Sequence, residues 1–177
     1  WKPFRKSTQH HAPNVRIVFD KFHIMKHLSE ALDEVRRSEY KRASEKDKRF
    51  IKGQRYTLLS HKSNLDVKGQ KALGMLLKAN KRLNKAYLLK ESFGQLWDYS
   101  NPTWARKFFD NWKSQLRWQR LPSFEKFAQL IENHWEGIIS YCHPDHKVSL
   151  GFMEGLNNKI RLIQRRAYGI RDKEYLM

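Results

Sequence analysis

The sequence predicts a mainly helical protein with one short strand near its N-terminus. Long segments repeat apolar residues at three- and four-residue spacing, which is typical of helices with one buried face. The best strand candidate is residues 15–19, Val-Arg-Ile-Val-Phe, a β-branched and aromatic run that follows a turn at Pro13-Asn14. A length of 177 residues with 40% hydrophobic content suits one packed domain, or one core with an insertion.

A helix is expected directly after this strand. Its buried stripe recurs at Met25, Leu28, Leu32 and Val35. Asp20 lies at the junction, and functional groups collect where a strand of an α/β sheet ends and the chain emerges into a crevice. Asp20 is therefore a candidate site residue, and the structural alternative is that it only caps the helix.

The middle of the chain, from about Val67 to Tyr141, is expected to be almost continuous helix. Asn101-Pro102 starts a third helix of this region as N-cap and first helical residue, and Pro122 restarts the pattern for a fourth. Residues 55–59 are either a short strand or an extended link. The aromatic residues of the third and fourth helices are expected in a helical core, with base-stacking platforms as the alternative: Trp104, Phe108, Phe109, Trp112, Trp118, Phe124, Phe127 and Trp135.

A last helix is expected after a polar turn at residues 143–147. Ser149 can cap this helix, which runs to about Arg166 and stops near Gly169. Its second turn carries Glu154, the acid that precedes a basic stretch with no other acid, residues 155–171. The structural alternative for Glu154 is an exposed acid neutralised by neighbouring cations.

Helical spacing gives this last helix two faces. The polar face carries a carboxylate, amides and guanidiniums, namely Glu154, Asn157 or Asn158, Arg161 and Arg165. Another face, expected to be packed, carries Leu156, Ile160 and Ile163.

The charge of the chain indicates a polyanionic partner. An excess of 36 Lys and Arg over 18 Asp and Glu gives a formal charge of +18, for which nucleic acid is the leading partner. A membrane is not expected as partner, because no apolar run approaches a spanning helix and no signal peptide opens the sequence. The single cysteine, Cys142, fits a reducing compartment, so we expect a soluble intracellular protein.

These residue types suit metal-dependent phosphodiester chemistry. Two magnesium ions can activate a nucleophile and neutralise phosphate charge, and carboxylates such as Asp20 and Glu154 are their preferred ligands. Two acids leave such a site short of a ligand. His23, three residues after Asp20, can orient that carboxylate or be a plain structural histidine. The cations expected to hold the nucleic-acid backbone are Lys159, Arg161, Arg165 and Arg166.

Two segments resemble the DDE-type transposases of the ISL-three insertion-sequence family. They are Val-Phe-Asp-Lys-Phe-His-Ile-Met at residues 18–25, and residues 153–169, which contain Met-Glu-Gly-Leu-Asn-Asn-Lys-Ile-Arg. The resemblance covers the whole chain and implies an incomplete RNase H-like core with a large all-helical insertion. It places core elements in residues 1–40, the insertion in residues 41–147 and a C-terminal core helix in residues 148–177.

The resemblance also implies an activity and its site. Asp20 and Glu154 would be the second and third catalytic acids and would bind two Mg²⁺ or Mn²⁺ ions, while Asn157 and Asn158 would join the four cations in binding DNA. The substrate would be double-stranded DNA, at transposon ends and at target sites. The protein would be cytoplasmic and associated with the bacterial nucleoid. The complete parent protein could form a homo-oligomer.

The opening Trp1-Lys2-Pro3-Phe4 lacks an initiator Met, so we expect part of a longer protein. In the family the first catalytic Asp lies just upstream of this segment, and we therefore expect the chain to be inactive alone. Two alternatives remain at this level: a non-catalytic, basic helical module that binds nucleic acid or serves assembly, and a nuclease that hydrolyses DNA without strand transfer.

Overall fold

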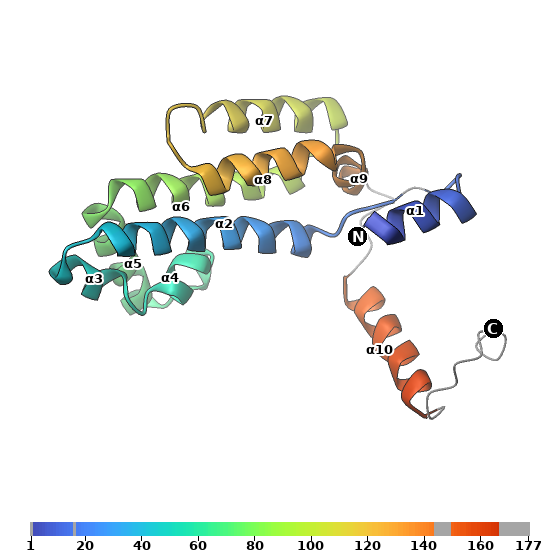
Figure 1. Ribbon diagram of the computed structural model, residues 1–177, viewed down its shortest axis with the longest axis horizontal. Coiled ribbons are helices and arrows are strands. Elements are labelled where there is room, and N and C mark those ends of the chain that lie inside the picture. Colours follow the sequence, from blue (N-terminus) through green and yellow to red (C-terminus); the bar gives the residue numbers. More distant parts are fainter. Residues whose placement is uncertain (1, 16, 144–149, 167–177) are drawn as a thin grey trace. The chain divides into compact units, whose positions relative to one another are not determined.

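The computed structural model describes residues 2–15, 17–143 and 150–166, and these residues are mainly helical (Figure 1). The chain divides into two compact units, residues 1–144 and residues 145–177. The α-helices and 3-10 helices (η) are α1 (Lys2–His11), α2 (Lys21–Arg42), α3 (Glu45–Ile51), α4 (Arg55–Leu59), η1 (Lys62–Asn64), α5 (Val67–Ala79), α6 (Lys81–Phe93), η2 (Gly94–Asp98), α7 (Pro102–Ser114), α8 (Pro122–Asn133), α9 (Trp135–Ile139), η3 (Ser140–Cys142) and α10 (Leu150–Arg166).

The first unit is organised around α2, which packs against both α6 and α8. Leu28 and Leu32 are fully buried on the face that the sequence predicts. Behind them lies an aromatic cluster in which the Phe93 ring meets those of Trp112 and Phe127 edge to face, with centroids 4.9 and 5.0 Å apart. Most of the aromatic residues of the middle region are thus core residues, as predicted.

Capping residues confirm where several helices begin. The Asn101 side chain accepts hydrogen bonds from the backbone of Thr103 and Trp104, and Pro102 opens α7. Pro122 likewise opens α8, although no side chain caps that helix. Residues 55–59, which could have been strand or link, form α4. The predicted cap at Ser149 and stop at Gly169 lie outside the described residues.

The predicted strand at residues 15–19 is absent from the described part of this segment, where residues 15 and 17–19 have no regular secondary structure. A strand needs a neighbouring extended segment to complete its hydrogen bonds. Here the Phe19 backbone N–H donates instead to the Gly137 carbonyl of α9, at 2.9 Å. The segment is therefore fixed by a helix, and its β-branched composition does not decide its conformation.

Two further predictions on the helices were wrong in detail. The fourth helix is interrupted at His134, so that α8 ends and the short α9 begins. The third helix ends at Ser114, and Trp118, expected on its buried stripe, is 87% exposed. The spacing of apolar residues can continue past the end of a helix, so periodicity alone does not show where a helix is interrupted.

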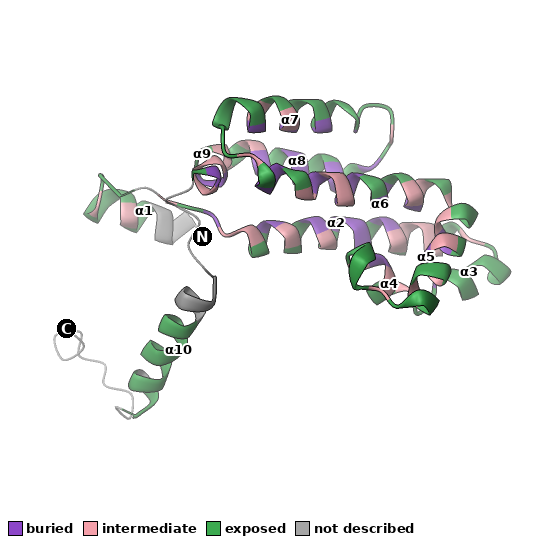
Figure 2. Ribbon diagram, turned by 180° about the vertical axis from the view of Figure 1, so that it is seen from behind, coloured by how far each residue is buried: buried purple, intermediate pink, exposed green. Residues whose placement is uncertain are grey.

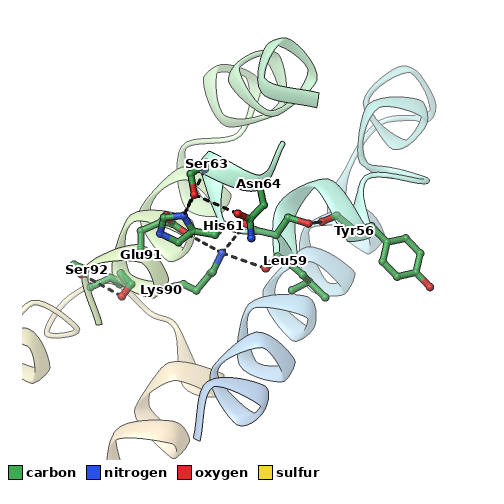
Figure 3. Close-up of polar contacts among 10 residues, drawn as sticks. Tyr56, Leu59, His61, Ser63, Asn64, Lys90, Glu91 and Ser92 are labelled. Atoms are coloured by element: carbon green, nitrogen blue, oxygen red, sulfur yellow. Dashed lines mark hydrogen bonds and ion pairs between the residues drawn. The ribbon is translucent and has the colours of Figure 1, made fainter. Parts of the chain in front are cut away.

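A buried lysine attaches α4 and η1 to α6 (Figure 3). Lys90 donates to the carbonyl oxygens of Leu59 and Ser60, at 3.2 and 2.9 Å, where α4 ends, and forms an ion pair with Glu91 at 2.7 Å. Nearby, burial raises the pKa of Tyr87 to about 12, and the Glu91 carboxylate acts in the same direction. This polar cluster adds hydrogen bonds and an ion pair to the apolar packing of Leu58 against the same core.

The division into residues 1–40, 41–147 and 148–177 stays a prediction. Helix α2 runs without a break across the first of these boundaries, from Lys21 to Arg42. Its two ends therefore belong to one rigid element.

We expect Gly137→Ala to destabilise the protein by about 1–3 kcal/mol, because a Cβ there would overlap the Phe19 ring and lie 3.1 Å from the Ile17 carbonyl oxygen. Gly74→Ala is the matched control: it also lies within a helix but has nothing within 4 Å, so it should stabilise by about 1 kcal/mol. Urea unfolding followed by circular dichroism measures both. Equal gains in the two variants would contradict the seating of Phe19 on α9.

Candidate active site

Asp20 occupies the N-cap of α2. Its Oδ1 accepts a hydrogen bond from the Phe22 backbone N–H at 2.8 Å, and its backbone is extended. The residue before it, Phe19, is buried and its ring lies 5.1 Å from that of His134. Asp20 is therefore held from both sides, by the buried Phe19 and by the helix that it caps.

The second carboxylate oxygen of Asp20 faces the next helical turn. Oδ2 lies 3.9 Å from Nε2 of His23, which is beyond hydrogen-bond distance but within the range of an ion pair when the ring is protonated. The Asp20 side chain is 27% exposed, so solvent and solutes can reach it. The contact is compatible with His23 orienting Asp20, which stays a prediction.

Asp20 fits one position in a set of magnesium or manganese ligands. Its carboxylate is a hard oxygen donor, and capping occupies only one of its two oxygens. Within the described residues, no three His, Cys, Asp or Glu side chains form a group that could hold a metal. The sequence prediction pairs Asp20 with Glu154, and this pairing stays a prediction.

Helix α10 forms over the predicted range and carries position 154 in its second turn. The side chains of residues 155–163, 165 and 166 are exposed, among them Asn157, Asn158, Arg161 and Arg165 on the predicted polar face. The Glu154 side chain lies outside the described residues. Arg165 and Arg166 stand in the last turn, where cations favour the helix dipole.

The face of α10 predicted to be packed carries three apolar side chains that α10 itself leaves exposed, and its packing stays a prediction. Leu156, Ile160 and Ile163 are 41%, 44% and 50% exposed. The sequence pattern places these residues on one side of α10, and the described side chains of this helix are exposed (Figure 2). Packing depends on a partner surface, which spacing along one helix does not reveal.

The predicted site residues thus fall into two groups. Asp20 and His23 stand together at the start of α2, in residues 1–144, while the residues of α10 belong to residues 145–177. The pairing of Asp20 with Glu154 would connect the two units, and it stays a prediction.

A family model described as a transposase matches residues 1–177. The chain belongs to the ISL-three family of DDE-type transposases. It is 36% identical over 170 residues to the transposase for insertion sequence element IS1001 of Bordetella parapertussis. It is also 33% identical over 129 residues to the transposase for insertion sequence element IS1557 in two strains of Mycobacterium tuberculosis.

These relatives are much longer than the region of similarity. The match covers 94% of this chain but 41% of the Bordetella protein, and 73% of this chain but 28% of the Mycobacterium proteins. No solved structure gives a significant match. Within the described residues, no helix is long and apolar enough to span a membrane.

Two tryptophans, Trp104 and Trp118, are exposed and each has a cation beside its ring, which the sequence does not predict. Lys107 Nζ lies 4.7 Å from the centre of the Trp104 ring, and the Arg117 guanidinium lies 5.7 Å from that of Trp118. The sequence predicts both rings in the core, with base stacking as the alternative. For Trp118 a signal was present: polar and charged residues surround it between Ser114 and Pro122.

We expect Asp20→Ala to cost about 1 kcal/mol of stability, because the first turn of α2 loses its cap. Asp20→Asn keeps an oxygen that accepts from the Phe22 N–H and should cost only a few tenths of a kcal/mol. Thermal unfolding of the 177-residue chain distinguishes the two. If Asn and Ala were equally destabilising, capping would not be the structural role of Asp20.

Proposed function

We propose that this chain is the C-terminal catalytic part of a DNA transposase that cleaves and joins phosphodiester bonds at transposon ends. The observation that carries the proposal is the family match over residues 1–177, joined by relatives named as transposases. The +18 charge supports DNA as the substrate. The complete enzyme would include the length that these relatives have beyond this chain.

In this proposal Asp20 and Glu154 bind the catalytic metal. Asp20 brings a partly exposed carboxylate fixed by the α2 cap, and Glu154 brings a second from α10. Mg²⁺ or Mn²⁺, when bound, supplies an activated nucleophile and neutralises charge on the phosphate oxygens. Another acid from the complete protein would fill the ligand set. His23 would keep the Asp20 carboxylate oriented from 3.9 Å away.

The exposed polar face of α10 would bind the DNA backbone beside this metal site. Arg161 and Arg165 share the face of position 154 by their spacing, and each can grip a phosphate through two parallel hydrogen bonds. Asn157 and Asn158 add amide donors, while Lys159 and Arg166 flank the face. The arrangement would hold a scissile phosphate next to Glu154, and a homo-oligomeric parent complex could bring two such ends together.

A non-catalytic nucleic-acid-binding module remains the second candidate, favoured by the positive charge together with the absence of a metal-binding cluster among the described residues. Both candidates predict DNA binding, and only the transposase predicts that the two acids are needed for chemistry. The measurements below separate them.

We expect the affinity of this chain for duplex DNA to fall steeply with salt, because phosphate contacts release counterions. Arg161→Ala and Arg165→Ala should each reduce the slope of log K against log salt by about 1. Lys68→Ala, which removes one exposed charge from α5, is the matched control and should leave the slope nearly unchanged. Equal effects at all three positions would show diffuse charge and contradict an α10 binding face.

In the complete transposase, Asp20→Asn and Glu154→Gln should each reduce excision of a marked element at least about 100-fold, because a neutral amide replaces a metal-binding carboxylate. Asn retains the cap of α2, so the loss at Asp20 would not reflect unfolding. Asp98→Asn, at an exposed acid that ends η2, should excise as the wild type does. Wild-type excision by either acid variant would refute the metal assignment.

A further inference from the structure

The turn between α7 and α8 exposes a tryptophan. Trp118 is 87% exposed and lies within residues 115–121, a loop that extends beyond the ends of the two helices (Figure 1). Burial of such a side chain normally contributes strongly to folding, and here almost none of that contribution is realised. Trp118 is therefore not needed for the hydrophobic core.

The backbone of this turn is strained at the same position. Trp118 and Arg120 have φ angles of 69° and 53°, in the left-handed region that bulky side chains rarely adopt. Each such residue costs on the order of 1 kcal/mol, and glycine or asparagine would relieve the cost. Strain of this kind is concentrated at functional sites, which points to a role for the exposed ring.

The strained turn is anchored rather than loose. Leu116 and Leu121, on either side of the tryptophan, are buried, and the Gln119 N–H donates to the Leu116 carbonyl at 3.0 Å. Arg82 of α6 donates to the Arg120 carbonyl oxygen and forms an ion pair with Glu39 of α2 at 3.4 Å. These contacts hold the backbone of the turn that carries Trp118.

A groove runs from this ring to α6. It has a volume of about 760 Å³, which is in the range of small-ligand pockets, and no acidic residue lines it. Lys85 and Leu88 line it from α6, and Arg117 and Trp118 from the turn. The Arg117 guanidinium lies over the Trp118 ring, 5.7 Å from its centre. A cationic groove that ends on an aromatic ring suits a stacked base with its phosphates.

We propose that the α7–α8 turn is a DNA-binding site in which Trp118 stacks on an unpaired base while Lys85 and Arg117 bind the adjoining backbone. The inference rests on the proposed function for the identity of the polyanion. A second copy of the chain is a poorer occupant, because both surfaces would be cationic and each chain carries a charge of +18.

The test compares two DNA probes with the 177-residue chain: a fully paired duplex, and the same duplex with one unpaired 2-aminopurine. We expect the wild type to bind the second probe about tenfold more tightly and to quench its fluorescence by stacking. Trp118→Ala should lose both the preference and the quenching, with affinity for the paired duplex kept within about twofold. Trp118→Asn should behave in the same way and fold at least as stably, because asparagine tolerates the left-handed backbone.

Trp104→Ala is the matched control, since it removes another exposed tryptophan with a neighbouring lysine, but from the regular helix α7. It should keep the preference and the quenching. Equal binding of both probes by the wild type would overturn this inference and leave the proposed function standing, whereas binding of neither would sink both. The inference would also be overturned if Trp104→Ala lost the preference for the probe with the unpaired base. It would equally be overturned if Trp118→Ala changed only the self-association of the protein, measured by sedimentation.

Discussion

Burial of α2 between α6 and α8 is the constraint on which the first unit depends. The apolar stripe of α2 lies in the core, so the helix cannot rotate or slide without exposing Leu28 and Leu32. Its N-terminal residue is consequently fixed as well. The position of Asp20 thus follows from hydrophobic packing further along the helix, and from Phe19 seated on Gly137.

The sequence predicted those features that depend on neighbours along the chain. Periodicity and the Asn101-Pro102 signal located the helices, because a cap and a buried stripe are local properties. It failed where a distant contact decides, as at residues 15–19, which bond to α9 instead of to another strand. It also failed at Trp118: the polar and charged residues around it indicate a turn, but apolar periodicity alone places the ring on the buried stripe, and nothing in the sequence predicts its positive φ.

The site was predictable to a similar degree. The structure confirms Asp20 as the cap of α2, and its second carboxylate oxygen, 3.9 Å from His23, is compatible with the metal-binding role, which stays a prediction. The polar and apolar faces of α10 follow from helical spacing, but not the surface that meets them. Whether Glu154 reaches Asp20 depends on how two separate units meet, and no spacing rule covers that.

Because α2 is continuous, the distance between its two ends is fixed. Asp20 stands at one end and Glu39 near the other, about 28 Å away at 1.5 Å per residue. Through Arg82, Glu39 is tied to the turn that carries Trp118. A continuous helix with one buried face therefore sets a nearly constant distance between the candidate catalytic acid and the turn that carries the exposed ring, so a DNA molecule bound at both would have to span that distance.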